Sequence, residues 1–390
     1  MSYEQVDERV QSLIQTVEGA FAQSFGGQPE VLVVSPGRVN VIGEHTDYND
    51  GFVLPAAIDR HAVIGLRPRP DREVHVHAAD FGDTATFSLD YLVRTQQQSW
   101  ANYIKGVAWA LQGDGFKLQG FDAALASDVP VASGLSSSAA IEVGFACAFQ
   151  TLSHLDLDGV RRALLCQKAE NLFVGMNCGI MDQYVVSLGK AGHLLLIDCR
   201  SLGYELAPLP AGVSLVICNT RKKRGLVDSA YNTRRAECER GAAVLGVKAL
   251  RDVTPEMLDA RQGELEPVIY RRCRHVVTEN ARTLAAVEAM RAGNLARLGE
   301  LMNASHISLR DDYEVSCVEL DTMVELAWKQ PGVYGARMTG AGFGGCAVAL
   351  VADECARDFA AKVGPLYKEA TGIDGEIYVC RADDGVRALA

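Results

Sequence analysis

The chain has 390 residues, of which 48% are hydrophobic and 22% are charged, and its formal net charge is -11. This length is typical of roughly two or three domains, and the composition is that of a folded protein with ample apolar material for a buried core. The acidic balance argues against a nucleic-acid-binding surface, although a local cluster of donors can hold a phosphate even in an acidic protein.

Cysteine usage and the first residues predict a cytoplasmic location. The 11 cysteines are scattered without a CxxC pair, which is typical of reduced thiols and not of a disulfide framework or a zinc site. Residues 1–8 are acidic and lack a continuous apolar run, so we expect no signal peptide. No stretch of about 18 apolar residues occurs, so we expect no membrane span.

Strands and helices alternate irregularly along the first half of the chain. Apolar residues at helical spacing between Val6 and Phe21 predict an opening amphipathic helix. A valine-rich run at 31–35 predicts a buried strand that Pro36-Gly37 ends. The further predictions are strands at 39–42, 52–54 and 121–129, helices at 139–152 and 159–174, and a pair of strands at 192–199 and 213–219.

The second half is richer in helices. The predictions here are helices near 266–291, 294–303 and 315–329, a strand ending at Met338, a strand at 346–351, a helix at about 353–370 and a strand at 376–380. This irregular order indicates an α+β fold with mixed sheets and packed helices, not a doubly wound parallel sheet. A domain boundary is predicted near residue 205, in the polar and proline-containing stretch 200–210.

A polar segment between two apolar strands is the first candidate site. It runs from Glu44 to Asp50, and Arg38 and Asn40 precede it. Carboxylates accept hydrogen bonds from neighbouring hydroxyls, which is how proteins hold sugars. A polar surface turn remains the alternative interpretation of this composition.

A run of small residues at 130–139 is the second candidate. Gly134 lets the backbone approach a ligand closely, and three serines, 136–138, stand where a helix begins. A helix start offers unpaired N–H groups to a phosphate, whereas a simple N-cap needs only one serine. The phosphate loop GxxxxGK[ST] is absent from the sequence, so any nucleotide must be held differently.

Two other segments carry candidate residues. Gly340, Gly342 and Gly345 satisfy GxGxxG, but they lead into a strand, so we reject a dinucleotide site and predict a tight loop that a ligand or another element approaches. Glu170 lies late in an apolar-faced helix. Asp182 stands among apolar neighbours, where a lone carboxylate needs a cationic or metal partner; an exposed aspartate at a helix start is the alternative.

Several segments together resemble the galactokinases, a branch of the GHMP small-molecule kinases. Residues 36–49, PGRVNVIGEHTDYN, are similar to the galactokinase signature, and the serine loop and residues 338–345 look like the second and third GHMP motifs. The further similar segments, in the family's order, are 102–106, 178–184, 229–235 and 305–317. The serine and glycine loops specify only the superfamily, whereas the segment from Glu44 to Asp47 points to galactose.

The resemblance implies a two-lobed fold with the active site in the cleft between the lobes. The implied N-terminal domain is 1–205, with the sugar and phosphate loops, and the C-terminal domain is 206–390, with the glycine loop. The implied reaction transfers the γ-phosphoryl group of ATP to the anomeric hydroxyl of galactose, with Mg²⁺ as cofactor. No nucleic acid, membrane or obligate protein partner is implied.

The resemblance also implies roles for individual residues. Asp182 matches the catalytic base and Arg38 its cationic partner, which would keep a buried aspartate ionised; Asp182 then either takes the hydroxyl proton or mainly orients the hydroxyl. Ser138 and Glu170 are the implied Mg²⁺ ligands, with the hard oxygens that magnesium prefers. The implied sugar-binding residues are Glu44, His45, Thr46, Asp47, Gly179, Asp182 and Tyr231. The implied ATP-binding residues are Ala132, Ser133, Gly134, Leu135, Ser136, Ser137 and Ser138, and Lys223 adds positive charge nearby.

Three positions depart from the family pattern without removing a side chain assigned to chemistry. Ala132 and Asp50 stand where glycine is common, and Val318 stands where proline is common. Two alternative functions stay open, namely a catalytically inactive regulator that binds galactose and ATP, and a kinase of a related sugar such as N-acetylgalactosamine. Loss of serine-loop residues often marks such regulators, and here that loop is intact.

Overall fold

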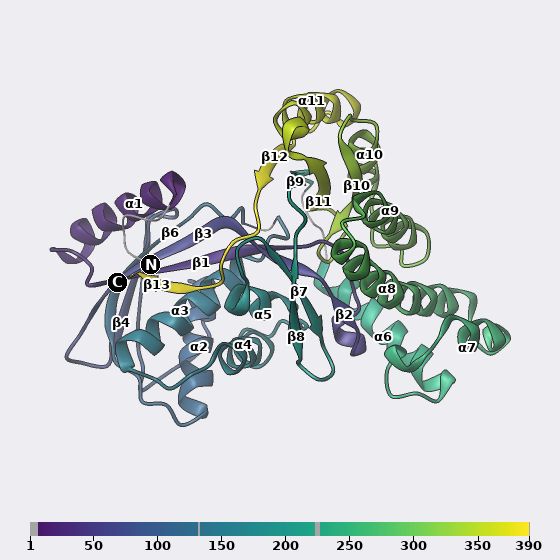
Figure 1. Cartoon of the computed structure of the whole chain (residues 1–390). Helices are drawn as coiled ribbons and strands as arrows, with labels where there is room; N and C mark the ends of the chain where they lie inside the picture. Colours follow the sequence, from purple (N-terminus) through teal and green to yellow (C-terminus); the bar gives the residue numbers. More distant parts are fainter. Residues whose placement is uncertain (1–6, 132, 223–226, 390) are drawn as a thin grey trace.

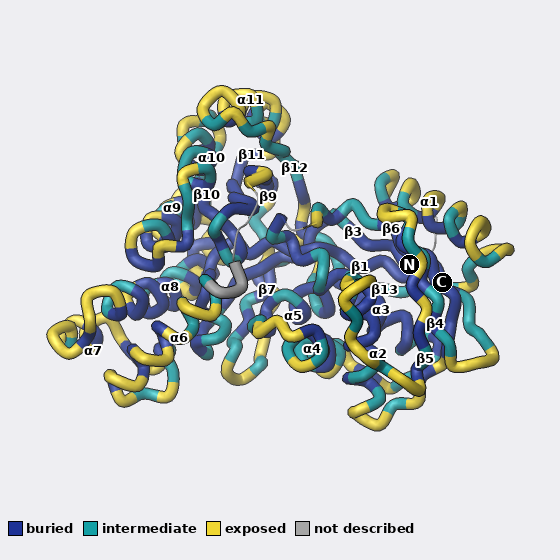
Figure 2. Tube along the Cα trace, turned by 180° about the vertical axis from the view of Figure 1, so that it is seen from behind, coloured by how far each residue is buried: buried dark blue, intermediate teal, exposed yellow. Residues whose placement is uncertain are grey.

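The computed structural model describes residues 7–131, 133–222 and 227–389 (Figure 1). Ala132 and Lys223 lie outside these residues. The described part of the chain holds no helix that is both long and apolar enough to cross a membrane. Three β-sheets organise the structure, and Figure 2 shows that their strands are mostly buried while the outer faces of α1, α7 and α11 are exposed.

The largest sheet has six strands in the order β13-β1-β3-β6-β4-β5. Its strands are β1 (Val31–Asn40), β3 (Pro55–Pro68), β4 (Glu73–Ala78), β5 (Asp83–Ser88), β6 (Phe121–Ser127) and β13 (Arg387–Leu389). Only the pairing of β4 with β6 is parallel, and the other pairings are antiparallel. The sheet is therefore mixed, as predicted.

Helices cover both faces of this sheet (Figure 1). On one face lies α1 (Glu8–Phe25), whose N-terminus is capped by the side chain of Asp7 and which buries its predicted apolar stripe. The helices of the other face are α2 (Ala101–Gly113), α3 (Ser137–Ser153), α4 (Gly159–Lys168) and α5 (Met181–Leu188), with a π-helical turn at Ala169–Val174 between the last two. Because successive side chains of a strand point to opposite faces, Val33 packs beneath α3 while Val34 packs beneath α1.

The prediction that Pro36-Gly37 ends the first strand was wrong, because β1 continues to Asn40. The register shifts at this point, so that Pro36 faces His61 while Gly37 faces Ile58. A bulge tolerates proline because it leaves the missing N–H without a ladder partner. Gly37 packs closely against the serine loop, since a Cβ there would lie 3.0 Å from the carbonyl oxygen of Leu135, a contact that only a small shift of the loop would relieve.

A second sheet has four antiparallel strands in the order β10-β11-β9-β12. They are β9 (Val213–Asn219), β10 (Val333–Thr339), β11 (Cys346–Ala352) and β12 (Glu376–Cys380), close to the predicted ranges. The helices α10 (Val318–Trp328) and α11 (Asp353–Thr371) pack on one face. The glycine segment does join two strands of this sheet, β10 and β11, as predicted.

The expected pairing of 192–199 with 213–219 was wrong. Both edges of β9 are occupied by β11 and β12. The strand β7 (His193–Asp198) instead joins β2 (Phe52–Val53) and β8 (Tyr204–Pro208) in a three-stranded sheet. This small sheet brings the end of the polar segment 44–50 next to a helical layer made by α6 (Val227–Leu245), α7 (Pro255–Ala260), α8 (Pro267–Arg291) and α9 (Leu295–Asp311).

The domain boundary near residue 205 stays a prediction. It falls within β8, between the strands of the first sheet and the start of the second. However, β13 returns to pair with β1, where Leu389 faces Leu32. A single boundary near residue 205 therefore assigns β13 to the C-terminal domain, although this strand belongs to the six-stranded sheet of the N-terminal domain.

Candidate active site

One cavity of about 990 Å³ lies where the three predicted loops meet. Elements from both ends of the chain contribute to its wall, including β1, the start of α3, the start of α5, α6 and the glycine loop. The predicted site residues that line it are Arg38, Glu44, His45, Asp47, Gly134, Ser136, Ser137, Ser138, Glu170, Gly179, Asp182 and Tyr231. A volume of this size accommodates a ligand larger than a single sugar.

Asp182 and Arg38 form an ion pair with two parallel hydrogen bonds in the wall of this cavity. Arg38 Nε donates to Oδ1 of Asp182 at 2.7 Å, and Nη2 donates to Oδ2 at 2.6 Å. The arginine is 5% exposed, whereas the carboxylate side chain is 27% exposed and faces the cavity. This two-bond geometry fixes the direction of the carboxylate as well as its charge. The predicted cationic partner of Asp182 is therefore in place.

The serine loop does not act as a simple helix cap. Ser136 adopts a left-handed conformation, with a φ of 58°, and its hydroxyl donates to Asp182 and does not cap α3. The N–H groups of the first turn of α3 thus have no serine cap, which favours the phosphate-site interpretation over a simple N-cap. Leu135 and Ser133, two of the predicted ATP-binding residues, are buried and do not line the cavity.

The predicted metal ligand Glu170 lies in a buried acidic cluster. Burial raises the pKa of Glu170 to about 7, although hydrogen bonds from Cys178, Gln183 and Ser138 lower it. The amide of Gln183 also donates to Glu142 at 3.0 Å. Burial raises the pKa of Glu142 well above its usual range, and the charge of Glu170 adds to this effect. Sequence reasoning missed Glu142, although an acidic residue within the apolar helix 139–152 was a visible signal.

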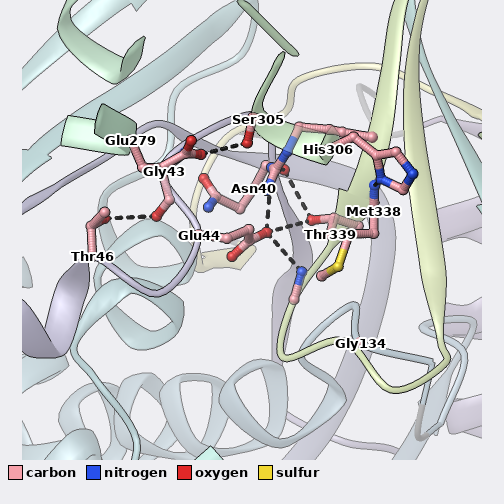
Figure 3. Close-up of polar contacts among 12 residues, drawn as sticks. Asn40, Gly43, Glu44, Thr46, Gly134, Glu279, Ser305, His306, Met338 and Thr339 are labelled. Carbon is pink, nitrogen blue, oxygen red and sulfur yellow. Dashed lines mark hydrogen bonds and ion pairs between the residues drawn. The ribbon is translucent and has the colours of Figure 1, made fainter. Parts of the chain in front are cut away.

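Glu44 connects the polar segment 44–50, called the sugar segment below, to the glycine loop at 340–345 (Figure 3). Its Oε1 accepts a hydrogen bond from the backbone N–H of Gly340 at 2.7 Å and lies 3.0 Å from the hydroxyl of Thr339. The glycine loop is thus held by a carboxylate of the sugar segment, which is the close approach predicted for it. Glu44 lines the cavity although it is only 2% exposed. Because these hydrogen bonds hold its carboxylate, the carboxylate is fixed before any ligand arrives.

His45 is held by a chain of hydroxyl groups. Its Nδ1 lies 2.7 Å from the hydroxyl of Tyr48, which lies 2.8 Å from that of Tyr313. Burial lowers the pKa of His45 to about 3, so the imidazole is neutral at pH 7. Tyr231, from α6, packs beside it with ring centroids 5.7 Å apart.

Asp47 and Gly179 lie in contact on the cavity wall. Burial, together with the nearby charge of Asp182, raises the pKa of Asp47 to about 7. A Cβ at Gly179 would lie 1.7 Å from Oδ2 of Asp47, so only glycine leaves room for this carboxylate. The absence of a side chain at Gly179 therefore lets the carboxylate of Asp47 take its position, and the sequence did not indicate this role.

Thr46 differs from the other predicted sugar-binding residues. It is fully buried and does not line the cavity, and its hydroxyl lies 2.8 Å from the carbonyl oxygen of Gly43 and 2.6 Å from that of Phe52. Thr46 therefore stabilises the backbone of the sugar segment and does not face a ligand.

The lining of the cavity also includes large apolar residues that sequence reasoning missed. They are Phe81, Trp100, Tyr103, Val131 and Met176. Phe81 and Val131 are 57% and 67% exposed. A large exposed apolar side chain at a cavity mouth is typical of a ligand-binding surface. The available signal was the pair of aromatic residues Trp100 and Tyr103, just before and within the segment 102–106.

Comparison with known proteins gives matches along most of the chain. The galactokinase galactose-binding signature matches residues 19–68, the GHMP kinase N-terminal domain matches 102–190, and the GHMP kinase C-terminal domain matches 286–364. The structure superposes on mevalonate kinase of Methanococcus jannaschii with a TM-score of 0.65 at 20% identity, over 92% of this chain and 99% of the other. The fold and the site thus define a small-molecule kinase of the GHMP class.

Two closer relatives narrow this class. A galactokinase of Roseiflexus sp. (strain RS-1) is 51% identical over 371 residues, which cover 94% of this chain and 95% of the relative. The galactokinase of Lactococcus lactis, solved in complex with galactose, has a TM-score of 0.92 at 40% identity, over 97% of this chain and 99% of the other. The chain belongs to the galactokinase family, whose members are enzymes that phosphorylate galactose.

Proposed function

We propose that this enzyme transfers the γ-phosphoryl group of ATP to the anomeric hydroxyl of galactose, giving α-D-galactose 1-phosphate and ADP. The observation that carries the proposal is the Asp182–Arg38 pair, which lies between the serine loop and the sugar segment in one cavity. A carboxylate at this meeting point is suited to hold a hydroxyl toward a phosphate bound at the start of α3.

Asp182 has the acceptor capacity that this role requires. Its Oδ2 receives hydrogen bonds from Arg38 and Ser136, whereas Oδ1 receives one, from Arg38. A carboxylate oxygen accepts about two hydrogen bonds, so Oδ1 retains room for a sugar hydroxyl. There it can orient the hydroxyl and accept its proton as the new phosphate ester bond forms.

The sugar end supports galactose as the substrate. Glu44, His45 and Asp47 line the cavity with two carboxylates and a neutral imidazole, a set that can accept and donate hydrogen bonds to several hydroxyls. The Lactococcus relative was solved with galactose bound. We extend that ligand to this chain, with Glu44, His45, Asp47 and Tyr231 as its contacts.

Mg²⁺ is the proposed cofactor, with Ser138 and Glu170 as its ligands from the chain. Their hydroxyl and carboxylate oxygens fit a hard cation, and Glu170 shares hydrogen bonds with Ser138, Cys178 and Gln183 that direct it. Among the described residues no group of three or more metal-binding side chains is present, so phosphate and water would complete the coordination. When bound, Mg²⁺ supplies positive charge to the transferring phosphoryl group.

The remaining parts of the cavity suit the nucleotide. The N–H groups at the start of α3, which no side chain caps, would hold the triphosphate, and the apolar lining residues Trp100 and Phe81 would take the base. All 11 cysteines are described and have free thiols. Thiols of this kind are typical of a reducing compartment, which supports our proposal of a cytoplasmic enzyme.

A comparison of sugars tests the proposal most directly. Purified protein would be assayed for ADP release with galactose, N-acetylgalactosamine and arabinose at saturating MgATP. We expect the highest kcat/KM with galactose. A preference for another sugar would replace the substrate. Binding of galactose and ATP without ADP release would identify a regulator.

A further inference from the structure

We propose that Glu279, on α8, is a positioning residue for the sugar segment, residues 44–50. It does not line the cavity, but its carboxylate holds the backbone at the point where that segment leaves β1. This inference rests on the proposed function, because it assigns Glu279 an effect on galactose affinity. Nothing in the sequence pattern of 266–291 distinguishes this glutamate from the other charged residues of the helix.

The contacts of Glu279 are unusual for a charged residue on a long helix. The side chain is fully buried (0% exposed). Its Oε1 accepts hydrogen bonds from the backbone N–H of Gly43 at 3.0 Å and from the hydroxyl of Ser305 at 2.6 Å, and Figure 3 shows the bond to Ser305. Its Oε2 accepts one from Nε of Arg282 at 2.7 Å. Such a carboxylate is costly to bury and is tolerated because donors and a cation satisfy it.

The charge of Glu279 strengthens its bond to Gly43. Burial alone would raise the pKa of Glu279, but the charges of Arg282, His275 and Arg337 lower it to about 2. The side chain is therefore ionised at neutral pH. A hydrogen bond from a backbone N–H to an ionised carboxylate is roughly twice as strong as one between neutral groups.

Glu279 belongs to a row of polar residues that α8 presents to the sugar segment. His275, one turn earlier, has Nε2 3.1 Å from the carbonyl oxygen of Glu44. Asn280 accepts a hydrogen bond from the N–H of Phe52 at 2.9 Å. His275 and Glu279 are four positions apart and therefore share one face of α8, and Asn280 follows Glu279 at the edge of that face. One helix therefore holds both the start and the end of the segment that carries Glu44, His45 and Asp47.

The segment needs this support because its backbone is constrained. Gly43 and His45 both lie in the left-handed region, with φ of 98° and 62°. A Cβ at position 43 would lie 2.6 Å from the carbonyl oxygen of Phe52, so the turn is also crowded. Non-glycine residues in this region cost of order 1–3 kcal/mol and persist only when their surroundings fix them. Loss of the bond to Gly43 would loosen the two side chains that follow it, Glu44 and His45.

The test separates positioning from general stability. We would measure KM for galactose, KM for ATP, kcat and Tm in Glu279→Ala, Glu279→Gln and Ser305→Ala. Glu288→Gln is the matched control, since Glu288 lies on the same helix with its side chain 69% exposed. We expect Glu279→Ala to raise KM for galactose about tenfold or more, because a buried N–H loses its charged acceptor, and to change KM for ATP less than about twofold.

In the two milder variants the increase in KM for galactose should be smaller, because each keeps part of the hydrogen bonding around Gly43. Glu279→Gln retains an oxygen for Gly43, so we expect partial rescue, with KM for galactose between those of wild type and Glu279→Ala. Ser305→Ala removes one of the donors that orient the carboxylate, and we expect a rise of about twofold to threefold. As a readout without turnover, the rise in Tm that galactose gives the wild type should shrink in Glu279→Ala.

The outcomes that overturn the inference are distinct from failure of the proposed function. An unchanged KM for galactose in Glu279→Gln and Glu279→Ala would contradict the inference. Equal increases in KM for galactose and KM for ATP would contradict it as well. If Glu279→Ala does not fold, Glu279→Gln decides alone, and a wild-type KM for galactose in that variant removes the role. A wild-type enzyme that does not phosphorylate galactose would instead overturn the proposed function.

Discussion

The sugar end of the cavity is tied to both parts of the molecule, whereas the phosphate end is held by its own half. Backbone groups of Gly43, Glu44 and Phe52 are bonded to side chains of α8, and Glu44 is bonded to the glycine loop. The serine loop is instead held by Arg38, whose backbone N–H donates to Leu135 and whose guanidinium donates to Gly134. No comparable bonds from α6–α11 to the described residues of that loop, 133–136, are present in the structure.

This difference suggests how the two substrates are recognised. A sugar must be told apart from its isomers by the direction of each hydroxyl, which needs fixed side chains. A triphosphate is held through charge and backbone N–H groups, which tolerate small adjustments. Changes in the C-terminal half should therefore affect galactose more than ATP, and changes at Asp182, where both ends meet, should affect catalysis itself.

The largest expected effect is at that meeting point. Asp182→Asn keeps the size of the side chain but removes the base and one partner of Arg38. We expect kcat to fall by about 10²- to 10⁴-fold, because a positioned acid or base contributes that much. ATP binding and folding should be retained, as measured by nucleotide titration and Tm. A rate close to that of the wild type would remove Asp182 from its assigned role.

Gly179→Ala should break the sugar end alone. Its new Cβ would overlap Oδ2 of Asp47, so the carboxylate must move away from the cavity wall. We expect KM for galactose to rise roughly 100-fold, in line with the loss that a 1 Å misplacement causes, with KM for ATP nearly unchanged. Gly113→Ala is the control, since nothing lies within 4 Å of a Cβ there. If both variants keep the wild-type KM for galactose, Asp47 does not contact the sugar.

Glu170→Ala tests the phosphate end. We expect the Mg²⁺ concentration for half-maximal rate to rise about 10- to 100-fold, a loss typical when support for a metal site is removed, while KM for galactose stays near its original value. Mg²⁺ titration at saturating ATP and galactose would measure this. An unchanged titration would place the ligand elsewhere.

The pH dependence of galactose affinity should be the smallest of these effects. The pKa of Asp47 is raised from 3.8 to about 7, so the folded protein holds a proton that the unfolded chain has released in this window. Asp47 therefore lowers the free energy of unfolding as pH rises from about 4 to 7. The ionised form is the hydrogen-bond acceptor, so galactose affinity should rise roughly tenfold from pH 6 to 8.

This pH experiment needs a specific design because Glu170 has a pKa of about 7 as well. Galactose binding would be measured by calorimetry without nucleotide or metal, in the wild type and in Asp47→Asn. The slope should vanish in the variant. An identical slope in both proteins would assign it to another group.

Local signals in the sequence brought out residues that line the cavity, but not the distant contacts that hold those residues in place. The loops at 44–50 and 130–139 and the pair Asp182 and Glu170 stood out because polar residues interrupt apolar runs. The continuous strand β3 was missed, since Asp59, Arg60 and His61 interrupt its apolar pattern. Asp128 pairs with Arg60, and Asp383 lies 2.8 Å from His61. Those partners are distant in the chain.

Glu279 was missed for the same physical reason. A glutamate on a helix is expected to be solvent-exposed. Only the fold shows that the partners of Glu279 are Gly43 and Ser305. Buried polar groups are compatible with folding once they are paired, and sequence alone does not reveal pairs formed at long range.

The return of β13 to β1 also has a consequence for biosynthesis. Val34 pairs with Arg387, so the outer side of β1 waits for nearly the whole polypeptide to be translated, which takes roughly 20 to 70 s at usual elongation rates. During that interval the nascent chain presents an open strand edge to other polypeptides on crowded ribosomes. Chaperone dependence during expression should therefore decrease in a circular permutant that places 381–389 ahead of β1.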